Sequence, residues 1–253
     1  MPPTEHHAGL SMLRIWSNEG VQARRIQAER LFTLVIFCAA SALAQQNDWL
    51  IVPGKRLGPI TPDTRRADLD RLFGKANVRD QPVDKGEGPD DATVVFPDLP
   101  AEGLAIFWSQ SGNGEVELVQ ICYQLRSSSC RWHTENGATL GTDLQKLEKL
   151  NGRAFQIELW DYDAGGNISS WRGGKLASVF ENGGTTWGGY PSRLMLTVEP
   201  RKGSGPQLRE ILDVLEQQKR PLLSNDPAIR PLDPAVTRMT LSLPSRTHVP
   251  VVR

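Results

Sequence analysis

The chain has 253 residues, of which 29 are Lys or Arg and 29 are Asp or Glu, so its formal net charge at pH 7 is zero. Nucleic acids and anionic membranes attract proteins through concentrated positive charge, which this composition does not supply. We therefore expect neither nucleic acid nor a membrane surface as a partner. With 39% hydrophobic residues, the chain can bury a sizeable core.

The N-terminal region has the layout of a secretory signal peptide. Residues 31–40 form an apolar block that follows three arginines and precedes the small-residue pattern Ala42-Leu43-Ala44. This block is too short to span a bilayer, which takes about 20 residues. We expect residues 1–44 to be a signal peptide with an N-terminal extension. Cleavage after Ala44 would leave a periplasmic or secreted chain without a membrane anchor.

Two cysteines, Cys122 and Cys130, lie beyond this cleavage site. In an oxidising compartment, two thiols this close in sequence around a Ser-rich turn favour a disulfide. A metal site is the alternative, because His133 follows Cys130, but His248 is the only other histidine of the expected mature chain. A structural zinc site needs four ligands, so we predict a disulfide and expect no metal or other cofactor.

The first predicted helix opens at Thr61-Pro62, where a threonine cap precedes a proline in the first turn. Gly74 supplies the left-handed residue that ends it. Its apolar stripe consists of Leu69, Leu72 and Phe73. Three predicted strands follow, at 93–96, 104–108 and 116–123, and the short turns between them indicate an antiparallel meander.

A second helix repeats this plan. Thr142 and Gln145 have the spacing of a capping box, and Asn151-Gly152 ends the helix. Its apolar stripe consists of Leu144, Leu147 and Leu150. The strands predicted after it are 155–160, 166–171, 175–180 and 193–198.

The pattern changes after Pro200. Apolar residues of 206–218 recur at the spacing of an amphipathic helix, and 236–243 alternates as a strand that would close the second sheet from an edge. We therefore predict an α+β fold of two tandem modules, each a short helix packed on a four-stranded antiparallel meander, with a C-terminal helix and edge strand. The expected modules are 45–130 and 131–243, and 244–253 is a tail.

This layout resembles the secreted β-lactamase inhibitory proteins, and one copy of it resembles the small lipoprotein of the outer-membrane barrel-assembly machinery. The segments "TVVFP", "WHTENGATLGTDLQKLEKLNGRAF" and "GGNISSWRGGKL" are similar to an uncharacterised family of exported bacterial proteins. The last resemblance implies no activity. The first implies two sheets that together present a concave surface to a protein partner.

Two motifs resemble known ligand-binding loops, but each lacks a residue that the binding requires. Asp161 and Asp163 begin a calcium-like loop, but its twelfth position is Arg172, where a glutamate is needed. Gly174-Lys175 is followed by leucine, where a phosphate loop requires Ser or Thr. Both segments fit turns between strands.

Aromatic residues gather between positions 160 and 190, among pairs of glycines. They are Trp160, Tyr162, Trp171, Trp187 and Tyr190. Exposed together, these rings would form a binding surface. The alternative is that they pack on the second sheet or under the helix at 206–218.

The sequence thus favours an exported, non-enzymatic module that binds a protein or peptide partner. The alternative is an envelope hydrolase that uses Asp161, Asp163 and Glu181. Glycoside cleavage would require two such carboxyl groups about 5 to 9 Å apart in a cleft, which a sequence does not show.

Overall fold

The computed structural model describes residues 48–86, 88–109, 114–125, 130–160, 165–180, 193–202, 206–217 and 221–243. Gln45–Arg253 forms one compact unit, separate from Met1–Ala44. The expected signal peptide, its cleavage site after Ala44 and the tail from 244 lie outside the described residues. Within the described part, no helix is both long and apolar enough to cross a membrane.

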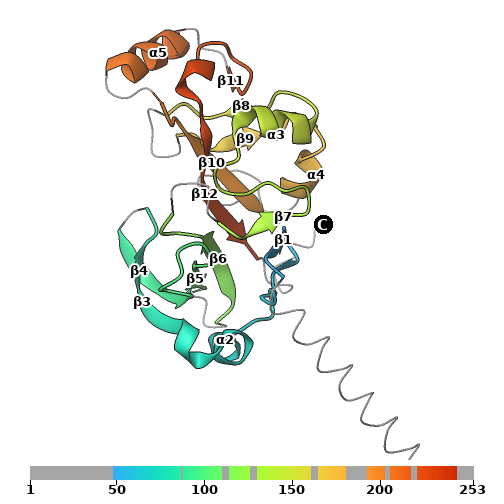
Figure 1. Cartoon of the computed structure of the whole chain (residues 1–253), viewed down its shortest axis with the longest axis vertical. Helices are drawn as coiled ribbons and strands as arrows, with labels where there is room; N and C mark the ends of the chain where they lie inside the picture. Colours follow the sequence, from blue (N-terminus) through green and yellow to red (C-terminus); the bar gives the residue numbers. More distant parts are fainter. Residues whose placement is uncertain are drawn as a thin grey trace, which may run out of the picture. The chain divides into compact units, whose positions relative to one another are not determined.

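The largest element of the fold is a six-stranded antiparallel sheet with the strand order β10-β12-β6-β5-β4-β3 (Figure 1). Its strands in chain order are β3 Val78–Asp84, β4 Pro89–Val95, β5 Leu104–Trp108, β6 Val116–Ile121, β10 Leu194–Glu199 and β12 Ala235–Ser242. The last strand of the described chain therefore lies inside the sheet, between β10 and β6. Segments from both expected modules share one sheet.

Two small sheets flank this one. The first has the order β2-β1-β7, and the second the order β11-β8-β9. Their strands are β1 Leu50–Val52, β2 Arg56–Leu57, β7 His133–Thr134, β8 Gln156–Ile157, β9 Ile168–Ser170 and β11 Leu222–Leu223. The β1–β7 pair is parallel, and the other pairs are antiparallel.

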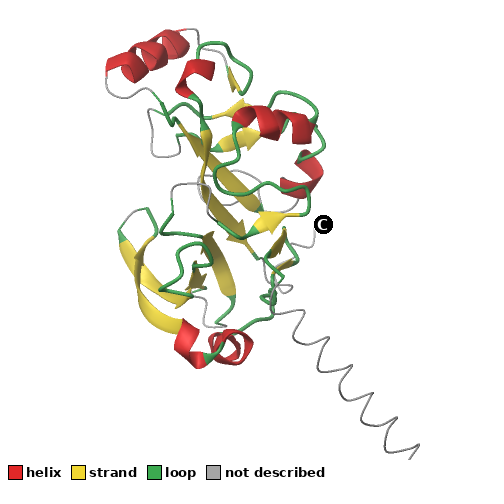
Figure 2. Ribbon diagram, viewed as in Figure 1, coloured by secondary structure: helices red, strands yellow, loops and turns green. Residues whose placement is uncertain are grey.

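The helices are short (Figure 2). The α-helices are α2 Arg66–Phe73, α3 Leu144–Asn151, α4 Ala177–Phe180 and α5 Pro206–Gln217, and the 3₁₀ turns are η1 Lys75–Asn77 and η3 Arg230–Leu232. The α+β class is therefore confirmed. The predicted C-terminal helix is also present as α5.

Both predicted leucine stripes face the core. Leu69 of α2 and Leu147 of α3 are fully buried, and Leu144 is 5% exposed. All three belong to the main hydrophobic core beneath the six-stranded sheet. Leucines that are three or four residues apart lie on one face of a helix. Helices this short are stable because that face packs on a sheet.

The helix starts differ from the predicted ones. α2 begins at Arg66, because the Asp68 carboxylate accepts the Arg65 backbone N–H at 3.0 Å, while Thr61 forms a local turn with Thr64. In α3 the cap is Asp143, whose carboxylate accepts the Lys146 N–H at 2.7 Å. Thr142, the expected cap of α3, instead accepts the backbone N–H of Thr139 at 3.1 Å, so it stabilises the turn before this helix.

Both helices end at the predicted glycines. Gly152 ends α3 in the left-handed conformation, with φ 78°. α2 ends at Gly74, as predicted, but with φ 84° and ψ 132° this glycine does not adopt the predicted left-handed helical conformation.

The predicted first meander is present as β4, β5 and β6. It gains a fourth strand, β3, which the sequence analysis did not identify. Pro82 and several charged residues break the usual strand composition there, and these residue types are typical of a sheet edge, which β3 occupies.

The predicted second meander does not form. β8 and β9 pair in a separate small sheet, and 175–180 contains the helix α4 instead of a strand. β10 joins the six-stranded sheet. The expected edge strand is the interior strand β12, because six of its eight residues are buried and both of its sides are paired.

Alternating side chains give the six-stranded sheet an inner and an outer face. The inner face includes Val95, Leu104, Ile106, Val119, Ile121, Leu194, Leu196, Met239 and Leu241, and packs in the main core with α2 and α3. The outer face carries a second cluster, Val83, Ala92, Val94, Ala105, Phe107 and Leu118. We call this second set the outer cluster.

The β3–β4 hairpin bends over the outer cluster. β4 pairs with β5 only through Thr93–Val95, so the far half of the hairpin is free to curve. The Lys85 ammonium then lies 5.3 Å from the centre of the Phe107 ring and 3.4 Å from the Glu117 carboxylate. Figure 1 shows β3 and β4 curving as a pair. The bend places β3 opposite the ends of β6 and β12.

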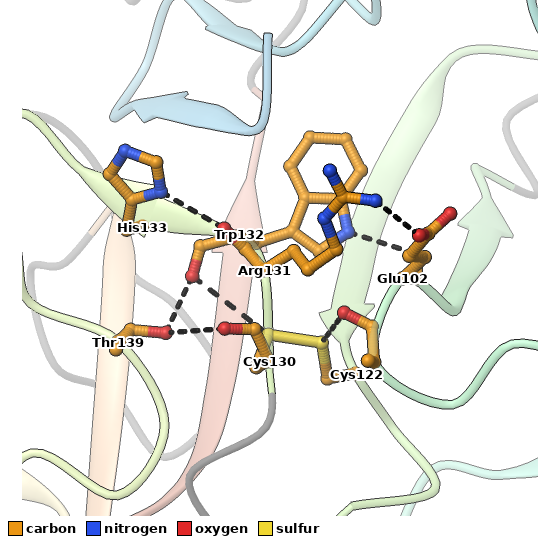
Figure 3. The surroundings of a disulfide bond; sticks show 8 residues. Glu102, Cys122, Cys130, Arg131, Trp132, His133 and Thr139 are labelled. Carbon is orange, nitrogen blue, oxygen red and sulfur yellow. Dashed lines mark hydrogen bonds and ion pairs between the residues drawn. A yellow bond between two sulfur atoms is a disulfide. The ribbon is translucent and has the colours of Figure 1, made fainter. Parts of the chain in front are cut away.

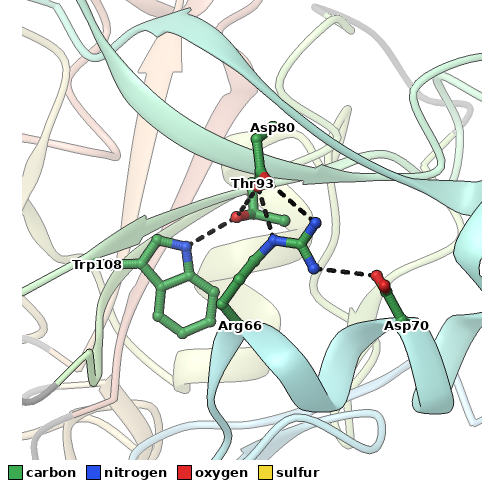
Figure 4. Close-up of polar contacts among 5 residues, drawn as sticks. All are labelled: Arg66, Asp70, Asp80, Thr93 and Trp108. Carbon is green, nitrogen blue, oxygen red and sulfur yellow. Dashed lines mark hydrogen bonds and ion pairs between the residues drawn. The ribbon is translucent and has the colours of Figure 1, made fainter.

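A polar network fixes α2 to the root of this hairpin (Figure 4). The Arg66 guanidinium donates to both oxygens of Asp80 on β3, at 2.7 and 3.0 Å, and to Asp70 at 3.0 Å. Thr93 of β4 donates to the same Asp80 carboxylate at 2.6 Å. The Trp108 indole of β5 donates to the Thr93 hydroxyl at 2.9 Å. A continuous series of hydrogen bonds therefore runs from α2 through β3 and β4 to β5.

Replacing Leu147 by alanine is expected to lower the free energy of unfolding by about 2 to 5 kcal/mol, because it leaves a cavity in the core. Leu99→Ala is the matched control, since Leu99 is 48% exposed and its replacement should change stability by less than about 0.5 kcal/mol. Urea unfolding of both variants measures the difference. Equal losses would show that α3 does not pack as described.

The Asp80 network predicts a pH dependence of stability. The Arg66 hydrogen bonds hold the pKa of the Asp80 carboxyl below its usual value. The folded pKa is thus lower than the unfolded one, so the stabilisation is full above the unfolded pKa of about 4 and is lost as pH falls through the folded pKa. Between about pH 5 and pH 2, Asp80→Asn should lose less stability than the wild type.

The size of this difference is expected to be small and salt-dependent, because the Asp80 side chain is 64% exposed. Asp91→Asn on the neighbouring strand is the control, since Asp91 makes no ion pair within the described part of the chain. Parallel pH profiles of the wild type and Asp80→Asn would contradict the prediction.

Candidate binding groove on the six-stranded sheet

The bend of the hairpin leaves a groove of about 430 Å³ between β3 and the ends of β6 and β12. One wall is formed by residues 81–86, which include the second half of β3. The other wall is formed by residues 120–125, at the end of β6, and by Thr237 and Arg238 of β12. Its volume lies within the range of about 300 to 1,000 Å³ that is usual for ligand sites.

A β-bulge in β12 shapes this second wall. Val236 is opposite Val198 of β10, and Arg238 is opposite Thr197, so Thr237 is an extra residue without a partner across the strand pair. A bulge changes the direction of side chains near it. Here it brings the consecutive residues Thr237 and Arg238 to the same groove.

Thr237 is 9% exposed, and its buried hydroxyl has no hydrogen-bond partner among the described residues. Most buried hydroxyl groups are hydrogen-bonded, and an unpaired one costs about 1 to 3 kcal/mol. Within the described chain, the Arg238 guanidinium likewise has no carboxylate within ion-pair distance. Two residues that line the groove thus carry polar groups without a partner in the described part of the chain.

Three neutral amides line the same groove, those of Gln81, Gln120 and Gln124. Gln120 donates to the backbone carbonyl of Asp84 at 3.4 Å, and Gln124 donates to the carbonyl of Pro97 at 3.3 Å. An amide side chain carries two donors and an acceptor, so it matches the hydrogen-bonding groups of a polypeptide backbone.

A disulfide holds the loop that carries Tyr123. Cys122 and Cys130 are bonded, as predicted, and their Cα atoms are 5.9 Å apart. Tyr123 packs against the outer cluster, and burial raises the pKa of its phenol, which a hydrogen bond with Gln124 partly opposes. The Tyr123 ring therefore belongs to the apolar part of this wall, together with Ile121 and Leu125.

The segment around Cys130 is anchored to the core (Figure 3). The Trp132 indole donates to the backbone carbonyl of Glu102 at 2.9 Å, and Thr139 donates to the carbonyl of Trp132 at 2.6 Å. Arg131 pairs with the Glu102 carboxylate at 2.6 Å and lies 4.3 Å from the Trp49 ring. The disulfide therefore connects the groove wall to a rigid part of the chain.

Of the described members of the aromatic cluster, Trp171 lies in the core and Trp160 is partly buried against it, so Trp171 is not the exposed ring that a binding surface would need. Trp171 is only 3% exposed and lies 4.9 Å, centre to centre, from both Phe155 and Phe180. Trp160 is half-buried, and its indole donates to the backbone carbonyl of Val198 at 2.7 Å. Tyr162, Trp187 and Tyr190 lie outside the described residues.

The other candidates from the sequence are three acidic residues and one histidine. Asp161, Asp163 and Glu181 lie outside the described residues. His133 is exposed, and its Nδ1 lies 2.9 Å from the backbone carbonyl of Arg131. A search of the described residues finds no group of three or more His, Cys, Asp or Glu side chains that could hold a metal ion.

The sequence analysis missed Thr237 and Arg238. It treated 236–243 as a regular alternating strand, and a bulge leaves no mark in the hydrophobic pattern. A polar Thr-Arg pair within a strand of buried residues is the one signal that could have drawn notice to this point.

No family model matches the chain, and searches of curated proteins and of solved structures find no match to it. The resemblances to inhibitory and assembly proteins therefore remain predictions.

The unpaired Thr237 hydroxyl predicts that Thr237→Val raises the free energy of unfolding by about 1 kcal/mol, because valine keeps the shape and removes the buried polar group. Thr134→Val is the matched control. The Thr134 hydroxyl donates to the Ala138 carbonyl at 3.2 Å and accepts the Ala138 N–H at 3.0 Å, so its loss should destabilise by about 1 to 2 kcal/mol. Chemical denaturation measures both, and changes of the same sign would contradict the assignment.

Proposed function

We propose that the protein is a non-enzymatic binding module whose groove takes an extended segment of a partner polypeptide. The observation that carries this proposal is that polar groups without a described partner and neutral amides line the same groove. Among the described residues, Thr237 and Arg238 have no partner, and the glutamine amides around them suit a peptide backbone.

The bent hairpin supports binding within the groove rather than growth of the sheet at its edge. Strand β3 is an edge, but Pro82 has no N–H to offer an added strand, and Asp80 and Asp84 oppose close packing of another chain. A partner held by side chains in the groove avoids both obstacles.

The hydrolase alternative has less support at this site. Acid–base cleavage of the kind expected from paired carboxylates needs two of them in one cleft. Among the described lining residues, Asp84 supplies a carboxylate, and it already accepts the backbone N–H of Gly86 at 2.8 Å. The glutamines and Thr237 instead offer neutral hydrogen bonds.

We further propose that the protein works outside the cytoplasm, as the signal-like segment at 1–44 predicts. The Cys122–Cys130 disulfide supports this location, because such bonds persist mainly in oxidising compartments. A disulfide at the groove wall would keep Tyr123 in place there.

The proposal predicts that a photoreactive residue in the groove will capture the partner. p-Benzoylphenylalanine at Gln81 or Gln124 should crosslink the same polypeptide in producing cells, because these positions lie on opposite walls of the groove. The same residue at Glu148, on α3, is the control, since this helix packs on the inner face of the sheet. Mass spectrometry of the crosslinked products identifies the captured segment.

A groove-filling variant makes this test specific. Adding Gln120→Trp to the Gln81 probe should abolish the crosslink by occupying the space between the walls. Thermal unfolding checks that this variant folds, and Gln124→Trp serves in its place if it does not. Crosslinks that persist in a filled groove, or that arise equally from position 148, would refute the proposal.

A further inference from the structure

We infer that the groove recognises an acidic side chain, Asp or Glu, within the bound segment, and that Arg238 and Thr237 hold its carboxylate. This inference rests on the proposed function and adds the chemistry of one position in the partner. It follows from the Arg238 guanidinium and the Thr237 hydroxyl, which have no partner within the described chain.

Arg238 is the available positive charge of the described groove. The other cation that lines it, Lys85, lies 3.6 Å from Asp90 and 3.4 Å from Glu117, and covers the Phe107 ring. Arg238 has no such partner within the described chain, although it is half-buried. A half-buried guanidinium has lost part of its hydration and gains most from a carboxylate, which it can bind through two parallel hydrogen bonds.

Thr237 adds a second donor next to Arg238. Its hydroxyl is the unpaired buried group of the bulge, and rotation about one side-chain bond can turn it toward a carboxylate oxygen. A carboxylate has about four acceptor sites, enough for both residues. Binding would then satisfy two groups that have no partner within the described residues.

The position of the amides favours an acidic side chain over a chain end. Gln81 lies on one wall and Gln124 on the other, and Gln120 connects the walls through its hydrogen bond to the Asp84 carbonyl at 3.4 Å. The Gln81 amide and the amide oxygen of Gln124 can therefore bind a peptide backbone on both sides of the groove. A segment held on both sides continues past Arg238, and its carboxylate then comes from a side chain.

A display library tests this inference. Random ten-residue peptides are displayed with both ends fused to the carrier, so that no free C-terminus is presented. They are selected for binding to the protein that is purified after expression of the full chain. Parallel selections use Arg238→Gln, Thr237→Val and the control Arg209→Gln, whose arginine is exposed on α5. Enriched peptides are then synthesised with Glu or Asp, and with the matching Gln or Asn, at the selected position.

We expect the wild type and Arg209→Gln to enrich peptides with Asp or Glu at one fixed position, and Arg238→Gln to lose this preference. Replacing that acid by its amide should weaken binding about 10- to 100-fold, because hydrogen bonds to charged groups contribute about 1.5 to 3 kcal/mol. Thr237→Val should weaken it about 3- to 10-fold while leaving the protein at least as stable.

The outcomes separate the inference from the function on which it rests. Groove-dependent peptides, lost in Gln120→Trp, that carry no fixed acid or bind Arg238→Gln equally well would overturn the carboxylate inference and leave the proposed function standing. If no peptide is enriched, or if all bind the filled groove unchanged, the proposed function fails and the inference fails with it.

Discussion

The pairing of β12 with β6 is the contact on which the rest of the structure depends. It joins the end of the described chain to the first meander through the partners Met239–Ile121, Thr240–Gln120, Leu241–Val119 and Ser242–Leu118. β10 reaches the sheet only through β12, and the groove takes residues from both β6 and β12. Because loop closure over so long a separation costs entropy before it gains contacts, this pairing is also expected to form late in folding.

Local sequence patterns made much of the fold predictable. The neighbour of each strand in the sheet could not be predicted from them. Helical spacing identified the buried faces of α2 and α3, and alternation identified β6, β10 and β12 as strands. Alternation does not say which strand lies beside which, so two meanders were expected where one six-stranded sheet and two small sheets form. The apolar run at 175–180 is too short for its period to distinguish a strand from the helix α4.

The candidate site was unpredictable for a related reason, since it arises from two irregularities. One is the bulge at Thr237, and the other is the bend of a hairpin that pairs with β5 only near its root. Neither changes the hydrophobic pattern. Of the residues that the sequence did single out, Trp171 packs in the core and Trp160 packs against it, because aromatic rings contribute as much to a core as to an interface.

The distinction between a structural and a functional bulge turns on the chemistry of Thr237. Curvature of the sheet would explain an extra residue in β12, but it would not explain a hydroxyl on that residue. Other buried polar side chains are satisfied: Asn151 donates to Trp171 and accepts from Leu176, and Thr197 donates to Asn167. Among the described residues, buried atoms of Trp49, Ser169 and Arg193 also lack a hydrogen-bond partner, but none of these three residues lines the groove. Thr237 differs from them because, within the described chain, its unpaired hydroxyl lies next to a guanidinium without an ion pair, in a groove where a ligand would restore the lost stability.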